Sequence, residues 1–310
     1  MNFFESSANL TPVQSLDEQE LWKKVREVEF KISKLVNNMF GGEYRSAFKG
    51  RGLDFKELKD YEQGDDPRHI DWRVSIKRGS LHVKKFTEER ELTVMIALDI
   101  SNSTLFGSDN QLKRETAIEF CASIAFSAMK NNDKIGLILF SDQIVEFIPP
   151  KKGKAHTIKI LKQIISYAYS YNQSTRTDLN PVFNLIQKDF KRKITTFIVS
   201  DFIADSFADK LKTTTYKHDI INVVLQDNLE KTIPNIGLVE FQDPETKIRY
   251  LLDTSDKKVI KKFTEYIQIK KDNLYELFKK NKSDKIVIDT DKSFIIPLNN
   301  FFKLRERNLR

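Results

Sequence analysis

Several common features are missing from this sequence, and each absence excludes a class of protein. It has one cysteine, Cys121, so no disulfide can form within the chain and a reducing compartment is expected. Its four histidines are too scattered to suggest a zinc site. No apolar run approaches the ~20 residues that cross a bilayer, and the first residues lack the basic and apolar regions of a signal peptide. We therefore expect a cytoplasmic protein that does not span a membrane.

The net charge of +8 is concentrated near the C-terminus. Residues 257–310 contain 15 lysines and arginines against 7 acidic residues, so the rest of the chain is neutral overall. A basic helical face can bind nucleic acid or an anionic membrane surface, but it is more often a solvated face whose lysine stems cover apolar neighbours. No RNA-binding pattern of aromatic residues and glycines accompanies it. We do not expect nucleic-acid binding, and we leave open a peripheral contact with a membrane partner.

Strands and helices alternate from residue 92 onward, which is typical of a mainly parallel sheet covered by helices. Apolar runs predict strands at 93–99, 134–140, 144–147, 194–200, 220–225 and 285–288, and a hairpin at 238–241 and 247–252. Helical spacing predicts helices at about 111–130, 154–170, 179–190 and 256–280. We expect a doubly wound α/β domain over residues 92–310.

Two further segments precede this domain. Residues 1–42 are expected to form a polar tail and a helix, because apolar residues recur at helical spacing from 16 to 40 and Gly41-Gly42 follows as a stop signal. In residues 43–91, glycine turns separate short alternating pieces such as 80–86. This pattern predicts a β-rich subdomain beside the sheet.

The segment 43–91 is also densely charged. Residues 43–90 contain 12 basic and 10 acidic side chains, too many to leave unpaired in a packed segment. We interpret them as arginine–carboxylate pairs that fix the segment against its neighbour, with a binding role as the alternative. Trp72 is expected to be buried, and Arg68 to pair with one of three nearby acids. The candidate interface residues are Asp65, Asp66, Arg68, Asp71 and Trp72.

The most informative stretch is residues 94–103, VMIALDISNS, in which an apolar strand runs into Asp99, Ser101 and Ser103. Side chains two apart point the same way at a strand end. One carboxylate and two hydroxyls are hard oxygen ligands that suit Mg²⁺ or Mn²⁺, and open α/β sheets place ligands at the carboxyl ends of strands. The stretch therefore predicts a metal site, and the alternative is an ordinary turn or helix cap.

The spacing Asp99-x-Ser101-x-Ser103 resembles the metal-ion-dependent adhesion site of von Willebrand factor A domains. The resemblance implies that both serines bind the metal directly. It also implies a third hydroxyl from Thr177, in the Thr-Asp-Leu sequence of residues 177–179, with Thr175 as the alternative. Asp201, which follows the strand 194–200, would act through water.

A second resemblance covers roughly residues 20 to 305. The stretch 64–72 reads Gly-Asp-Asp-x-Arg-x-Ile-Asp-Trp, and with Phe-Thr-Glu-Glu-Arg at 86–90 and the stretches 237–245 and 297–305 it closely resembles the bacterial domain-of-unknown-function family 58. This resemblance implies a von Willebrand factor A-like fold. It also implies a role as partner or adaptor of a MoxR-type AAA+ ATPase, because members are typically encoded beside such ATPases.

These features together favour a non-catalytic, metal-dependent protein-binding domain. In the adhesion sites one metal position is open to an acidic residue of a protein ligand, so the expected partners are the ATPase and an acidic protein. The alternative is a Mg²⁺-dependent phosphohydrolase that uses Asp99. Such chemistry commonly needs Asp-x-Asp, with one acid as nucleophile and the other as proton donor, and here Ser101 replaces the second acid.

Overall fold

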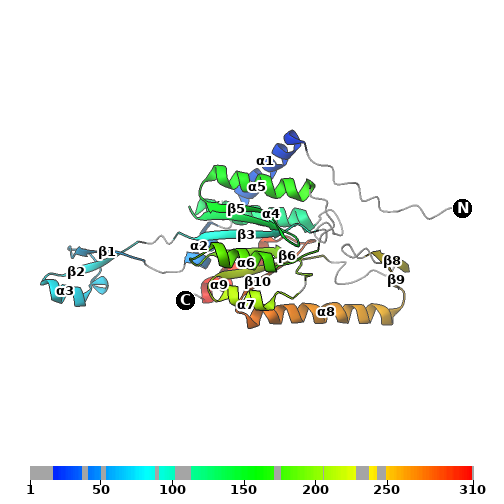
Figure 1. Cartoon of the computed structure of the whole chain (residues 1–310). Coiled ribbons are helices and arrows are strands. Elements are labelled where there is room, and N and C mark those ends of the chain that lie inside the picture. Colours follow the sequence, from blue (N-terminus) through cyan, green and yellow to red (C-terminus); the bar gives the residue numbers. More distant parts are fainter. Residues whose placement is uncertain are drawn as a thin grey trace.

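The computed structural model describes residues 17–36, 41–49, 54–87, 91–101, 113–170, 176–204, 206–227, 237–242 and 249–308. Its central sheet has six strands, β3 (Thr93–Asp99), β4 (Lys134–Phe140), β5 (Ile144–Lys151), β6 (Thr195–Ser200), β7 (Asp219–Gln226) and β10 (Asp284–Asp289). They lie in the order β10-β7-β6-β3-β4-β5 (Figure 1). Only β5 is antiparallel to its neighbour in this sheet. The sheet is the one predicted from the apolar runs.

The strand order defines a switch point at the centre of the sheet. From β3 the chain adds β4 and β5 on one side, and it then crosses over to build β6, β7 and β10 on the other. The carboxyl ends of β3 and β6 therefore lie side by side where the winding reverses. Open α/β sheets bind ligands at such a point, so the topology places the ends of these two strands in the position of a ligand site.

Two layers of helices cover the sheet. In β3, Val94, Ile96 and Leu98 face one apolar core, and Met95 and Ala97 face the other, as the two-residue period of a strand requires. The first core is completed by α1 (Glu18–Leu35), α2 (Gly41–Lys49), α4 (Lys113–Lys130), α5 (Lys154–Ser170) and α9 (Ile295–Asn308). The second is completed by α6 (Asn180–Asp189), α7 (Ala208–Thr215) and α8 (Lys257–Lys280). This double covering confirms the doubly wound architecture.

Residues 41–49 differ from the prediction. They form α2, which packs against α9 and brings the rings of Tyr44 and Phe302 to 6.0 Å. Gly41 and Gly42 therefore begin α2 and do not end α1, which stops at Leu35. Glycine is disfavoured in a helix by its backbone entropy, so the packing of α2 on α9 outweighs that local preference here. The N-terminal part of segment 43–91 thus belongs to the helix layer and not to a β-rich unit.

Residues 54–87, which we call the projecting unit, extend away from the sheet (Figure 1). The strands β1 (Asp54–Asp60) and β2 (His82–Thr87) pair antiparallel, and they carry the short helices η2 (Pro67–His69) and α3 (Trp72–Arg78). Gly79 ends α3 in the left-handed conformation, with a φ of 73°. The N–H of His82 donates to Ser75 Oγ at 2.8 Å and ties α3 to β2. The unit is therefore a small, internally bonded structure.

A second pair of strands lies near the C-terminal part of the chain. β8 (Leu238–Gln242) and β9 (Arg249–Asp253) pair antiparallel, which confirms the predicted hairpin. The helix α9 is not among the helices that the sequence pattern predicts. Within the described residues, no helix combines the length and apolar character that crossing a bilayer demands.

Candidate metal site at the switch point

The structure brings together four of the five predicted site residues. Asp99 ends β3, Ser101 follows it, Thr177 precedes α6, and Asp201 follows β6. Thr177 Oγ1 lies 2.9 Å from Ser101 Oγ and 3.3 Å from Asp99 Oδ2. All four are buried. Residues separated by up to 102 positions in the sequence thus form one group, which we call the candidate metal site.

Two residues of the original prediction cannot be placed. Ser103 and the alternative threonine, Thr175, lie outside the described residues. Their proposed roles stay predictions.

Asp99 is held by hydrogen bonds on both carboxylate oxygens. Its Oδ1 accepts from the N–H of Ser101 at 2.9 Å, and its Oδ2 accepts from Ser200 Oγ at 2.6 Å. Burial, together with the nearby charge of Asp201, raises the pKa of Asp99 to about 6, although the bonds from Ser200 and Ser101 oppose the shift. Two carboxylates buried close together favour the presence of a cation.

Asp201 is positioned by a tight bend after β6. Phe202 has a left-handed backbone with a φ of 58°, which a bulky residue adopts only when packing enforces it. Its ring packs 5.2 Å from that of Phe278 in α8, and its N–H donates to Ser200 Oγ at 3.0 Å. Asp201 Oδ1 accepts from the N–H of Ile203 at 3.2 Å. The bend thus fixes the carboxylate at the end of the strand.

The remaining carboxylate oxygen of Asp201 lies beside the buried ammonium group of a lysine. Lys113 Nζ, from the first residue of α4, lies 3.3 Å from Asp201 Oδ2, and the two side chains are 1% and 2% exposed. Sequence reasoning missed Lys113 because a single lysine at the start of a helix carries no pattern. It also missed Ser200, whose role depends on the neighbouring strand.

Thr177 is held in place through the next residue, Asp178, which makes two hydrogen bonds. The N–H of Asp178 donates to the carbonyl oxygen of Ser141 at 2.8 Å. Asp178 Oδ1 accepts from the N–H of Asn180 at 2.9 Å, at the start of α6. Leu179 is fully buried beneath the loop. The hydroxyl of Thr177 is therefore held toward the ends of β3 and β6.

The oxygen atoms of the site fit a small hard cation. Mg²⁺ binds oxygen at 2.0–2.1 Å in an octahedron, so neighbouring ligand oxygens lie about 3 Å apart. Thr177 Oγ1 is 2.9 Å from one candidate ligand oxygen and 3.3 Å from another. Among the residues that the structure describes, no group of three or more His, Cys, Asp or Glu could hold a metal ion. Ser101 and Thr177 contribute two hydroxyls to the candidate site and Asp99 one carboxylate, as the adhesion-site resemblance implied.

The predicted interface residues lie in the projecting unit. Arg68 pairs with Asp66, with Nη2 2.8 Å from Oδ2, which confirms one of the three expected pairings. Asp65 pairs with Lys59 at 2.9 Å. Asp71 caps α3 by accepting from the N–H groups of Arg73 and Val74, and it pairs with Lys84 at 3.1 Å. These ion pairs fix the unit internally, and not against its neighbour as predicted.

The prediction that Trp72 is buried is wrong. Its side chain begins the outer face of α3 and is 61% exposed. The helix turns Ser75 and part of Val74 toward β2 instead. A seven-residue helix on a two-stranded sheet has no second layer to cover its outer face.

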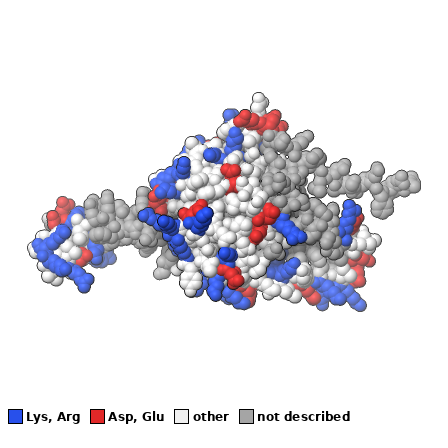
Figure 2. All heavy atoms as spheres, in the orientation of Figure 1, with Lys and Arg blue, Asp and Glu red and all other residues white. Residues whose placement is uncertain are grey.

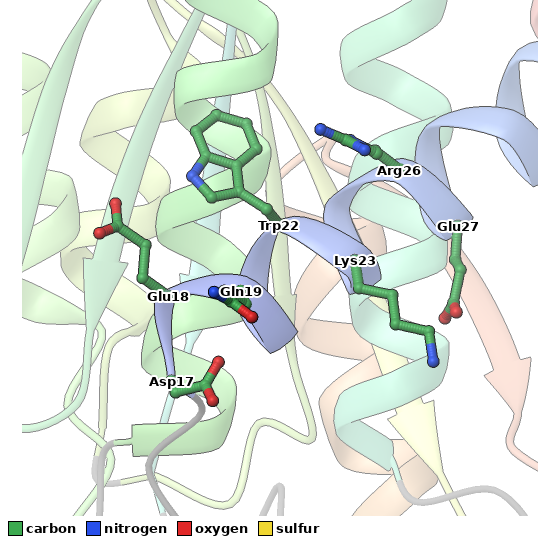
Figure 3. Close-up of a pocket in the computed structure, with 7 residues that line it drawn as sticks. All are labelled: Asp17, Glu18, Gln19, Trp22, Lys23, Arg26 and Glu27. Carbon is green, nitrogen blue, oxygen red and sulfur yellow. The ribbon is translucent and has the colours of Figure 1, made fainter.

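In a hollow on the outside of α1, side chains from different elements do not come together as they do at the candidate metal site. All of its lining residues come from one helix and its cap, as Figure 3 shows: Asp17, Glu18, Gln19, Trp22, Lys23, Arg26 and Glu27. Its lining has three acidic and two basic side chains, and Lys162 already lies 4.7 Å over the ring of Trp22. We assign no function to it.

The strand order, the switch point and the acid–hydroxyl group define a von Willebrand factor A-like domain. The chain belongs to the family described as Protein of unknown function DUF58, whose model matches residues 57–273. Uncharacterized proteins of Mycobacterium tuberculosis and Mycobacterium bovis are each 24% identical to it over 234 residues, which is 75% of this chain and 74% of theirs.

The chain is similar to several solved structures, and three of these are BatB, the SpRpn10 VWA domain and proximal thread matrix protein 1. BatB from Bacteroides thetaiotaomicron is 17% identical, with a TM-score of 0.46 over 70% of this chain and 99% of that one. The SpRpn10 VWA domain is 10% identical, with a TM-score of 0.38 over 68% of this chain and 95% of that one. Proximal thread matrix protein 1 from the mussel byssus, whose structure has a zinc-occupied MIDAS motif, is 14% identical. Its TM-score is 0.34 over 44% of this chain and 38% of that one.

Proposed function

We propose that this protein is a non-catalytic, metal-dependent protein-binding domain that takes Mg²⁺ or Mn²⁺ at the switch point. The observation that carries the proposal is the convergence of oxygen atoms from Asp99, Ser101 and Thr177 at distances that suit neighbouring ligands of one small cation. Ser101 and Thr177 would hold the ion through their hydroxyls. Asp99 would balance its charge, and Asp201 would act through water.

The chemistry of this donor set explains why a protein ligand would bind. Hydroxyls and water neutralise little of the charge of a divalent ion, so the ion keeps a strong attraction for a carboxylate. An Asp or Glu of a partner protein can then occupy the open metal position. The metal, when bound, bridges the two proteins.

The family resemblance supports a MoxR-type AAA+ ATPase as partner. In that arrangement this protein would couple ATP-driven remodelling to a client. The acidic ligand at the metal could belong to the ATPase or to the client, and binding experiments with each will assign it.

A second docking surface is supported by the exposed face of α3. Trp72 and Ile76 are one helical turn apart and are 61% and 80% exposed. Arg73 and Lys77 form a parallel row beside them and pair with no acid among the described residues. Figure 2 shows lysine and arginine side chains gathered on the projecting unit. Tryptophan and arginine dominate the energetics of many interfaces, so this face suits an acidic protein surface with an apolar recess.

The phosphohydrolase alternative has less support. Both oxygens of Asp99 already accept hydrogen bonds, and the nearest acid, Asp201, is paired with a buried lysine. A nucleophilic Asp99 would need a proton donor for the leaving group. A phosphatase assay with a generic aryl phosphate tests this alternative, and turnover that needs both Mg²⁺ and Asp99 would favour it.

The proposed function is tested by measuring ATPase binding with Mg²⁺ and with EDTA. Wild-type protein should retain the ATPase only with Mg²⁺, and Ser101→Ala with Ser103→Ala should abolish retention while thermal stability changes little. The control is Thr213→Ala, which removes an exposed hydroxyl in the last turn of α7. Equal binding in EDTA would move the docking point to the projecting unit.

A further inference from the structure

Lys113 is the feature of the site that the proposed function does not require. Among the described lysines and arginines it is the one that is buried, with an exposure of 0% for the whole residue. Burying an ammonium group costs much free energy unless an opposite charge and hydrogen bonds compensate it. Its nearby acid is Asp201, with Nζ 3.3 Å from Oδ2.

The position of Lys113 links it to the metal-binding chemistry. It extends from the first residue of α4, which faces the same end of the sheet as Asp99 and Asp201. With both acids ionised, the two carboxylates and one ammonium carry a net charge of −1 where the carboxylates alone would carry −2. A divalent cation at Ser101 and Thr177 would therefore meet less attraction and a repulsive charge nearby.

We propose that Lys113 is a resident counter-cation of the candidate metal site. It holds Asp201 in place while no metal is bound, and it lowers the affinity of the site for divalent cations. The metal ion then binds weakly and exchanges with solution, and it binds tightly only when a partner carboxylate also coordinates it. This inference rests on the proposed function, and Lys113 is a positioning residue that acts through Asp201.

A purely structural role makes a different prediction. The ion pair joins α4 to the end of β6, but α4 already packs on the sheet through a buried face that includes Ala117, Phe120 and Ile124. If the pair only fastens the helix, its removal will change stability and leave metal affinity unaltered. Metal affinity therefore separates the two roles.

The first test replaces the ammonium by a neutral chain of similar length in the full-length protein. In Lys113→Met, calorimetric titration with Mg²⁺ and with Mn²⁺ should show affinity at least about tenfold higher than in wild type, because a repulsive charge is gone. The metal-free variant should melt at a lower temperature, because Asp201 is left buried without its partner. An unchanged or weaker metal affinity would overturn the proposal.

A charge-matched pair of variants keeps the test decisive if Lys113→Met folds poorly. Asp201→Asn alone leaves the ammonium uncompensated and should weaken Mg²⁺ binding by about tenfold or more. Lys113→Met with Asp201→Asn has the same formal charge as wild type and should return the affinity to within about twofold of it. A double variant as weak as Asp201→Asn would contradict the role of Lys113.

The outcomes also separate this inference from the proposed function. If wild type and all variants bind Mg²⁺ equally, the metal site stands and the role of Lys113 falls. If folded wild type and Lys113→Met both bind no metal, the metal-dependent function falls and the inference falls with it. If only Lys113→Met binds metal, the role of Lys113 is confirmed and the proposed function, which needs metal bound to the wild-type protein, falls.

Discussion

The switch point and the projecting unit both present side chains suited to binding, but they hold them in opposite ways. At the switch point, Asp99 and Thr177 are 1% and 3% exposed, and neighbouring strands and loops fix their oxygen atoms. On the projecting unit, Trp72 and Ile76 are exposed on one short helix, and ion pairs within the unit fix that helix. The first region can organise a metal ion, and the second can bury apolar surface against a partner. Under the proposed function, one protein would have a metal-dependent and a metal-independent means of binding.

The largest expected effect concerns the metal. Asp99→Asn should abolish Mg²⁺ binding, because it removes the carboxylate charge that balances the ion, while its amide oxygen can still accept from the N–H of Ser101. The increase in melting temperature that Mg²⁺ gives the wild type should be absent in the variant. A variant that Mg²⁺ stabilises as much as wild type would remove Asp99 from the site.

The next largest effect concerns partner binding at the projecting unit, which should be lost without any change at the switch point. Trp72→Ala should weaken binding of a partner at the projecting unit by about thirtyfold, the cost of losing an interface anchor. Mg²⁺ affinity should stay unchanged, because α3 lies far from the switch point (Figure 1). The matched control is Tyr216→Ala, which removes another exposed aromatic side chain, 89% exposed at the end of α7. Equal losses in both variants would argue against a specific surface on α3.

A smaller effect is the loss of folding stability at acid pH, which limits the pH range in which binding at the two regions can be compared. Burial, with a contribution from Lys217, lowers the pKa of His218 to about 4, and its Nδ1 accepts from the N–H of Ile194 at 3.4 Å. Because the folded pKa lies below the ordinary value of about 6.5, this histidine stabilises the fold fully above pH 6.5 and less as the pH falls toward 4.

The change over that window should be about 2 kcal/mol in the free energy of unfolding. His218→Gln should remove most of this acid sensitivity, measured by urea denaturation at pH 7 and pH 4.5. If the variant keeps the full pH dependence, another group is responsible.

The smallest effect is on stability. Trp72→Ala should change the free energy of unfolding by less than about 0.5 kcal/mol, because the side chain is exposed. Had Trp72 been buried, as the sequence suggested, the cost would have been about 3–5 kcal/mol. Thermal denaturation of the variant distinguishes these values directly.

The sheet could be predicted because each of its strands is an apolar run that ends at a polar residue. Asp99 could be found for the same reason, because open α/β sheets bind ligands where their strands end, whereas Thr177 and Asp201 were implied by the resemblance to the adhesion site. Lys113 could not, because its burial depends on a partner 88 positions away. The exposure of Trp72 could not either, because hydrophobicity predicts burial only where a second layer exists to cover the residue.

The most direct test of the metal-dependent account is the anomalous diffraction of crystals grown with Mn²⁺. The account predicts one Mn²⁺ ion at the switch point, bound to Ser101 Oγ and Thr177 Oγ1, with Asp201 linked to it through water. The ion should be absent from crystals of Asp99→Asn. An empty switch point in wild-type crystals at saturating Mn²⁺, or an ion bound only elsewhere, would contradict the account.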